Sequence, residues 1–146
     1  MIIWAQKESR LVEEDVELDL SAALEATSAA SRQQLTLYIP DKDRAGKEIG
    51  DQRRWVLAAA DLLARIGGGV TIMPPVEGGW YDAENRVVIW ERPVLVYTFV
   101  NAEAFMSLLD ELRDFLHRLG RETDQGEVLA EFAGAAYRIT KYRGQP

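Results

Sequence analysis

Three polar segments, residues 41–44, 77–82 and 121–126, hold most of the side chains in this sequence that suit ligand chemistry. Carboxylates transfer protons, guanidinium groups bind anions through paired hydrogen bonds, and an aromatic ring beside glycines can contact a ligand or a partner. The candidate ligand-binding residues are Asp41, Arg44, Glu77, Trp80, Tyr81, Arg121 and Glu122. The same segments are also compatible with ordinary solvated loops, and the sequence leaves that alternative open.

The sequence lacks the residues needed for metal binding, for a phosphate-binding loop and for a serine hydrolase. The sequence has no cysteine and one histidine, His117, which excludes zinc–thiolate sites and histidine clusters. Asp41 and Asp43 have the spacing of a calcium loop, but basic residues intervene and the rest of that motif is missing. The glycines at 67–69 follow a predicted helix, the reverse of a phosphate-binding loop, and Ser107 has no histidine nearby. We therefore expect no metal site and no cofactor.

Alternating strand and helix patterns predict the elements that position the three segments. Proline and glycine mark the boundaries, as at Pro40 and Gly67, and Asn101 is a typical helix cap. Pro93 predicts a kink in one long strand and Gly134 an interruption in another. The predicted order is strand 35–39, helix 51–67, strand 70–73, a turn-rich connection, strand 87–100, helix 101–120 and strand 127–139.

This β-α-β-β-α-β order predicts an α+β fold with a ferredoxin-like core, an antiparallel four-stranded sheet with two helices on one face. In that topology the three polar segments meet at one end of the domain. Each helix has an apolar stripe that should face the sheet. The predicted core residues are Trp55, Leu62, Leu63, Phe105, Leu109, Leu112 and Leu116.

A family resemblance points to the same fold. The run Gly79-Trp80-x-Asp82, then Glu91, a leucine-rich helix and Gly120-Arg121-x-Thr123-x-Gln125 resembles uncharacterised bacterial domains with a ferredoxin-like layout. The resemblance covers about the last two-thirds of the chain. It implies this fold and no particular activity.

We expect a single domain, residues 1–146, with an acidic N-terminal extension at 1–34 and the ferredoxin-like core at 35–143. The extension has strand character at residues 2–5 and 11–18, which predicts an N-terminal hairpin with a turn at residues 7–10, followed by a short helix capped by Asp19 or Ser21. No signal peptide and no apolar run of about 20 residues is present, so we expect a soluble, cytoplasmic protein that does not cross a membrane.

Charge narrows the choice of partners. The net charge is −7, and residues 1–31 carry seven acids against Lys7 and Arg10. Because phosphate binding requires a basic surface, this composition disfavours nucleic acid as a partner. The acidic extension instead suits docking onto a basic protein.

Two functional hypotheses remain for the core. Helices on one face of the sheet leave the other face uncovered, which favours a non-catalytic binding or interaction module that self-associates as a homodimer through the sheet or the N-terminal hairpin. The alternative is a small enzyme at the three-loop end, where Glu77, Asp82 or Glu122 transfers a proton and arginines hold a small anionic substrate.

Overall fold

A computed structural model of the protein describes residues 19–27 and 33–145. The chain divides into two compact units, residues 1–31 and 32–146. The N-terminal hairpin expected at residues 2–18 lies outside the described residues.

A single short helix, α2 (Leu20–Ala23), is described in the first unit. It begins after Asp19, whose carboxylate oxygen accepts the Ala22 N–H at 3.2 Å. Of the two predicted caps, Asp19 is therefore the one that satisfies an N–H of the first turn.

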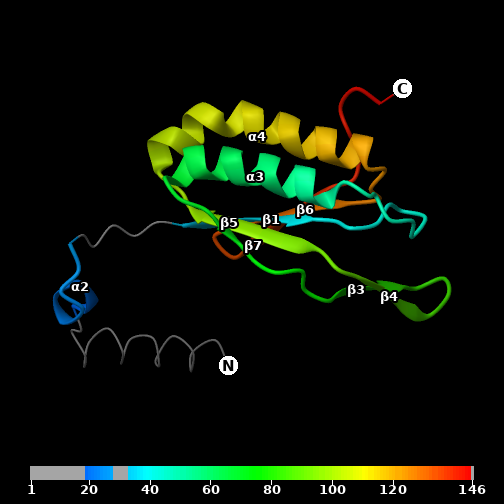
Figure 1. Cartoon of the computed structure of the whole chain (residues 1–146), viewed down its shortest axis with the longest axis horizontal. Helices are drawn as coiled ribbons and strands as arrows, with labels where there is room; N and C mark the ends of the chain where they lie inside the picture. Colours follow the sequence, from blue (N-terminus) through cyan, green and yellow to red (C-terminus); the bar gives the residue numbers. More distant parts are fainter. Residues whose placement is uncertain (1–18, 28–32, 146) are drawn as a thin grey trace, which may run out of the picture. The chain divides into compact units, whose positions relative to one another are not determined.

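The second unit contains one five-stranded sheet, a separate two-stranded hairpin and two helices (Figure 1). Its elements are β1 (Gln34–Ile39), α3 (Gln52–Gly67), β2 (Thr71–Ile72), β3 (Gly78–Asp82), β4 (Val87–Glu91), β5 (Val94–Phe99), α4 (Ala102–Glu122), β6 (Val128–Phe132) and β7 (Ala135–Ile139). The strand order is β2-β5-β1-β6-β7, and every pairing is antiparallel. The predicted α+β class, with an antiparallel sheet and packed helices, is confirmed.

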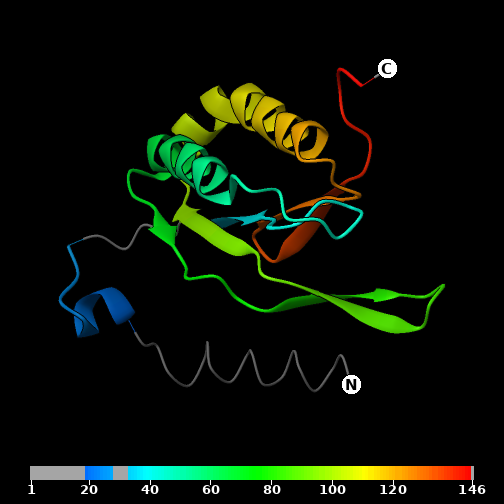
Figure 2. The same ribbon diagram turned by 45° about the vertical axis from the view of Figure 1, so that its right-hand side comes forward.

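Strand β1 lies at the centre of the sheet. Its Leu37 is opposite Val96 of β5 and Ala130 of β6, so both edges of the strand are paired. Since side chains alternate along a strand, Leu35, Leu37 and Ile39 share one face, and all three are buried. Figure 2 shows α3 and α4 side by side over one face of the sheet.

Apolar stripes on α3 and α4 complete the core, as their spacing predicts. The Trp55 and Phe115 rings meet between the helices with their centroids 5.9 Å apart. α4 begins at Asn101, whose side-chain oxygen accepts the Ala104 N–H at 3.0 Å. The buried helix residues are Trp55, Val56, Ala59, Ala60, Leu62, Leu63, Ile66, Leu112, Phe115, Leu116, Leu119 and Gly120.

Two glycines allow close packing. A Cβ on Gly67 would lie 2.6 Å from the carbonyl oxygen of Phe99, so the last turn of α3 can approach β5 only because that atom is missing. A Cβ on Gly120 would overlap the ring of Tyr142, which packs on α4 at this position. Any larger residue at either position would push the helix away from its neighbour.

The strand prediction is wrong in two places. The turn-rich connection and the first part of the predicted strand 87–100 form the hairpin β3–β4, which is not part of the main sheet. The predicted strand 127–139 is a second hairpin, because Ala133 and Gly134 both take positive φ (52° and 83°), as tight hairpin turns require. The main sheet therefore has five strands in place of the predicted four.

Two predicted core residues are not fully buried. Leu109 is 38% exposed, and Phe105 is partly buried against Phe132, with ring centroids 5.0 Å apart. Both lie in the first half of α4, whereas the buried residues of that helix begin at Leu112. The helical phase is right, but only the second half of α4 is covered.

Leu112→Ala should lower the free energy of unfolding by about 2–5 kcal/mol, because it leaves a cavity in the buried half of α4. Leu109→Ala is the matched control on the same helix and should cost clearly less, since Leu109 is already 38% exposed. Urea denaturation of both variants measures the difference. Equal losses would contradict this description of the core.

Candidate functional site

The connection between β1 and α3 contacts residues 90–92 of the hairpin on one side and the loop after α4 on the other. The Asp41 carboxylate accepts the Arg92 N–H at 3.0 Å, and Lys42 Nζ donates to the Trp90 carbonyl at 3.4 Å, so this loop lies against the base of the hairpin. On its other side the Arg44 N–H donates to the Asp124 carbonyl at 2.9 Å. The structure thus brings segment 41–44 against segment 121–126 and against the base of the hairpin. Residues 77–82 take part in neither contact, and they join this region through the pairing of β3 with β4.

Local hydrogen bonds hold that connection in shape. The Asp43 carboxylate accepts the backbone N–H of Ala45 at 2.9 Å and of Lys47 at 3.0 Å, and the Ile49 N–H donates to the Asp41 carbonyl. These bonds form a side-chain turn of the kind aspartate favours. The two aspartates that have calcium-loop spacing are used by this turn and by the hairpin contact.

Arg44 and Gln125 lock the connection to the loop after α4. The Arg44 guanidinium pairs with Asp124 at 2.9 Å and donates to the Gln125 carbonyl at 2.8 Å. The buried Gln125 side chain donates to the Lys42 carbonyl at 2.8 Å and the Thr123 carbonyl at 3.1 Å. Arg44 is therefore engaged by neighbouring residues. Gln125 was missed as a site-organising residue, although it belongs to the Gly120-to-Gln125 run of the resemblance.

Arg121 and Glu122, at the end of α4, also have nearby partners. The Arg121 guanidinium donates to the carbonyl of Arg143, and Glu122 pairs with Arg118 across one helical turn at 3.5 Å. His117 accepts the Arg143 N–H on its Nδ1 at 2.9 Å and is partly buried. These contacts fasten the C-terminal segment to α4.

The other three candidates lie on or beside the hairpin. Residues directly opposite in an antiparallel pair share a face, so Trp80 (opposite Ile89) lies on the same face as Glu91 (opposite Gly78). Tyr81 lies on the other face. Trp80 and Tyr81 are 50% and 62% exposed. Glu77 is exposed just before β3 and makes no ion pair with a described residue.

Glu91 is the carboxyl whose surroundings most favour acid–base chemistry. Burial raises the pKa of Glu91, the nearby Asp41 carboxylate raises it further, and Lys42 partly offsets both. Hydrogen bonds lower the pKa of two other carboxyl groups, Asp82 and Glu111. In the sequence, Glu91 stands out only as part of the family resemblance. Its raised pKa depends on neighbours that become close to it only in the folded chain.

Asp82, by contrast, is committed to the turn of the hairpin. Its carboxylate accepts the backbone N–H groups of Glu84 and Asn85 and the Asn85 side chain, the last at 2.8 Å. The hydrogen bonds from Asn85 lower the pKa of Asp82. It therefore remains ionised and is a poor proton donor.

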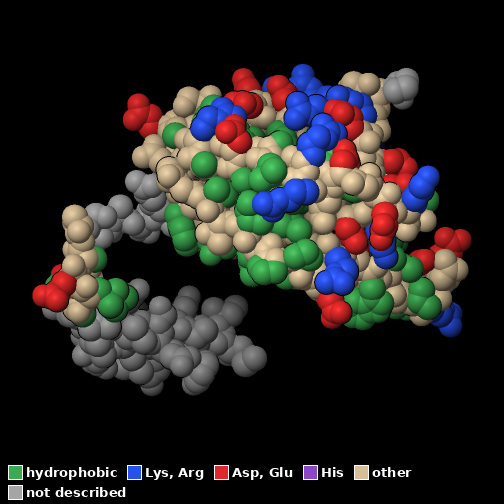
Figure 3. Space-filling model, viewed as in Figure 1, with side chains coloured by type: hydrophobic (Ala, Val, Ile, Leu, Met, Phe, Trp, Pro, Cys, Tyr) green, Lys and Arg blue, Asp and Glu red, His purple; other side chains and the backbone are tan. Residues whose placement is uncertain are grey.

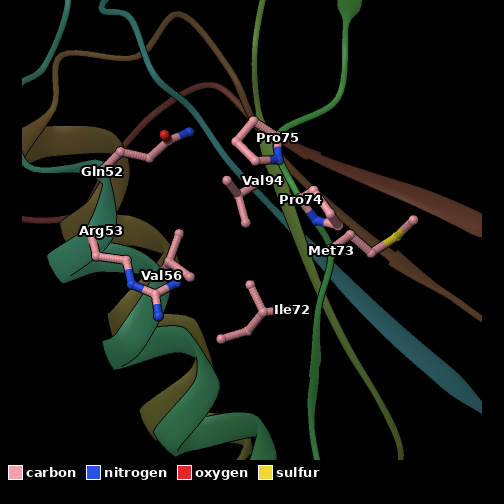
Figure 4. Close-up of a pocket in the computed structure, with 8 residues that line it drawn as sticks. All are labelled: Gln52, Arg53, Val56, Ile72, Met73, Pro74, Pro75 and Val94. Carbon is pink, nitrogen blue, oxygen red and sulfur yellow. The ribbon is translucent and has the colours of Figure 1, made fainter.

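An apolar groove opens beside the hairpin base (Figure 4). It encloses about 430 Å³ between the start of α3 and the β2–β3 connection. Its lining residues are Gln52, Arg53, Val56, Ile72, Met73, Pro74, Pro75 and Val94. Gln52 joins the groove to the hairpin base, because its side-chain nitrogen donates to the carbonyls of Ile39 and Arg92, each at 3.1 Å.

Within the described ranges, 19–27 and 33–145, no group of three or more histidine, cysteine, aspartate or glutamate side chains is placed to hold a metal ion. Over the same residues, no helix is both long enough and apolar enough to cross a bilayer.

Comparison with solved structures identifies the same fold in a phage SAM (S-adenosyl-L-methionine) lyase. The structure of that lyase in complex with S-methyl-5'-thioadenosine has a TM-score of 0.50 and 14% sequence identity, covering 80% of this chain and 95% of the lyase. Its apo structure gives a TM-score of 0.48 and 15% identity over 81% and 100% of the two chains. No family model and no curated protein matches the sequence. At this identity the likeness shows a shared fold.

Replacing Gln125 should destabilise the fold. Gln125→Ala removes the donor to one buried and one partly buried carbonyl, so we expect the free energy of unfolding to fall by about 1–3 kcal/mol. Gln145→Ala, at an exposed C-terminal position, is the matched control and should change it little. Thermal and urea unfolding measure the stability of both variants. An unchanged free energy of unfolding for Gln125→Ala would show that these hydrogen bonds do not stabilise the fold.

Glu91→Gln should stabilise the protein at neutral pH. Because the pKa of Glu91 is raised in the folded state, its contribution to stability is greatest at low pH and is lost as pH rises through that folded pKa. An uncharged amide avoids this loss, so the variant should gain most at pH 7, and the gain should shrink as pH falls toward 4.5, the ordinary glutamate value. Urea unfolding across this range tests it, with the exposed Glu103→Gln as control. A pH-independent difference would contradict the assigned environment.

Proposed function

We propose that this chain is a small enzyme whose site lies at the base of the hairpin, with Glu91 as its acid–base group and a small sulfonium compound of the S-adenosyl-L-methionine class as its substrate. The observation that carries the proposal is Glu91 itself, a partly buried carboxyl of raised pKa beside Asp41 and Lys42. The fold shared with a phage SAM lyase supports the substrate class by analogy.

The chemistry of the hairpin base suits a positively charged substrate. Two carboxyl groups, Asp41 and Glu91, lie near one another. Trp80, half-exposed on the same hairpin face as Glu91, offers an indole ring that attracts a cation or stacks on a nucleobase. The two arginines expected to hold an anion, Arg44 and Arg121, instead bond to a carboxylate and backbone carbonyls. We therefore favour a cation over the anionic substrate expected from sequence.

The proposed reaction is cleavage of a carbon–sulfur bond. The bonding electron pair leaves with sulfur, which becomes a neutral thioether, and the carbon fragment either loses a proton to Glu91, forming a carbon–carbon double bond, or is attacked by water, whose proton Glu91 accepts. Glu91 suits the proton transfer in both cases, since a carboxyl of raised pKa is a stronger base when ionised. Lys42 helps to keep it ionised.

We also propose that the core of this fold is ferredoxin-like. Strands β6-β1-β5-β2 follow one another across the sheet, α3 connects β1 to β2, and α4 connects β5 to β6. On this view β7 and the hairpin β3–β4 are additions to a four-stranded unit. Docking of the acidic extension onto a basic protein, and a cytoplasmic location, remain predictions from the sequence.

The test is to incubate the purified chain with S-adenosyl-L-methionine and to follow S-methyl-5'-thioadenosine by liquid chromatography with mass detection. We expect release of the thioether, and Glu91→Gln should lower kcat/KM by at least about 100-fold, the usual contribution of an acid–base group. Glu103→Gln, an exposed residue at the start of α4, should keep full activity.

Binding separates a failed reaction from a failed site. Calorimetric titration with S-adenosyl-L-methionine and with S-methyl-5'-thioadenosine should show saturation below about 1 mM, the upper end of ordinary KM values. Neither turnover nor binding at that concentration would overturn the proposal. Binding without turnover would favour the non-catalytic binding module over the enzyme.

A further inference from the structure

The hairpin β3–β4 projects as an arm, residues 77–92, whose strands pair only with each other in the described part of the chain (Figure 1). One face carries Trp80 and Val87, which are 50% and 47% exposed. The opposite face carries Tyr81, Val88 and Trp90, which are 62%, 44% and 63% exposed. Large apolar side chains are therefore uncovered on both faces. Figure 3 shows green atoms on the side of the hairpin that faces the viewer.

An isolated two-stranded hairpin is at best marginally stable in water, and clustered exposed aromatics mark interaction surfaces. The turn of this arm is well formed, because Asp82 bonds to the backbone of Glu84 and Asn85. Gly79 lets the Trp90 ring lie flat on the second face: a Cβ there would come within 3.1 Å of that ring. The arm therefore exposes an aromatic surface of the kind that a binding partner covers.

The groove beside the arm has complementary properties. It is walled by Val56, Ile72 and Pro74–Pro75, and Met73 at its edge is 37% exposed. Arg53 stands at its edge and forms no ion pair or hydrogen bond with any described residue, whereas its neighbour Arg54 pairs with Asp51. The groove is therefore apolar with one uncompensated positive charge.

We propose that the groove receives the arm of a second copy of this chain. The Tyr81, Val88 and Trp90 face of the arm packs on the apolar wall, and Glu84 at the arm's turn pairs with Arg53 of the other copy. Charge complementarity supports this occupant, because residues 77–92 contain four acids against two bases and the groove contributes a cation. The groove is partly open to solvent, so a projecting protein segment can reach it.

The order of the elements along the chain allows each copy to place its arm in the groove of the other. Pro74 and Pro75 line the groove and come just before β3, so each groove lies beside the root of its own arm. Five-residue strands make the arm about 17 Å long. Two copies related by a two-fold axis, with their arms antiparallel, would bring the tip of each arm to the root of the other. Two-fold closure yields a homodimer, the smallest assembly in which every arm is covered.

Multi-angle light scattering of the full chain at about 100 µM tests the association, since a modest interface has a Kd near 1 µM. We expect a mass above that of one chain, and a mass near the monomer for Arg53→Glu and for Glu84→Arg. The double variant, which restores opposite charges with reversed sign, should regain the oligomer. Arg113→Glu, on the exposed side of α4, is the control for a charge reversal of the same size.

A second variant tests the apolar contact. Tyr81→Ser with Trp90→Ser should also give monomers, and circular dichroism and thermal unfolding check that the chain still folds. Loss of the hairpin itself would mimic this result, but Arg53→Glu lies on α3 and leaves the arm intact. A monomeric wild type, or an oligomer that survives both Arg53→Glu and the arm variant, would overturn the proposal. Failure of the lyase assay leaves this outcome unaffected, because the variants and the readout are different.

Discussion

The buried amide of Gln125 fastens together segments that are far apart in the sequence. Its side chain donates to the Lys42 carbonyl, while its own carbonyl accepts from Arg44 and from the Tyr142 hydroxyl. A buried polar group is tolerable only when it is fully hydrogen-bonded, so these three segments must pack in one arrangement. Asp41 and Lys42 are placed against the hairpin base by this arrangement, and Glu91 receives its electrostatic environment from them.

Periodicity and capping signals were sufficient for the layered part of the fold. The stripe on α3, the cap at Asn101 and the alternation in β1 each reflect a local rule, and the helices and central strand form where those rules predict. The strands on either side of Pro93 were joined in the prediction, because both are rich in valine and aromatics. β5 belongs to the main sheet because it pairs with β1, whereas β4 pairs with β3 and lies outside it. Which strands pair depends on the whole chain and not on local sequence.

The candidate site shows the same division. Sequence alone identified the polar segments, and the topology explains why two of them, 41–44 and 121–126, meet. It could not indicate that Arg44 and Arg121 would be occupied by neighbouring groups, since their partners, Asp124 and Arg143, become neighbours only in the fold. Glu91 is the converse case: an ordinary strand residue by pattern acquires unusual chemistry from burial and from Asp41.

The central position of β1 has a consequence for synthesis of the chain. This strand pairs with β5 on one edge and with β6 on the other, and both are made much later. Until then the strand has two unpaired edges, and of the helices over the sheet only α3 has been made to cover its apolar side chains, Leu35, Leu37 and Ile39. Such non-local pairing slows folding. A nascent chain stalled before β5 would therefore present an unpaired β1 strand to which other chains could bind and aggregate. Both edges of β1 are paired only after β6 has been made.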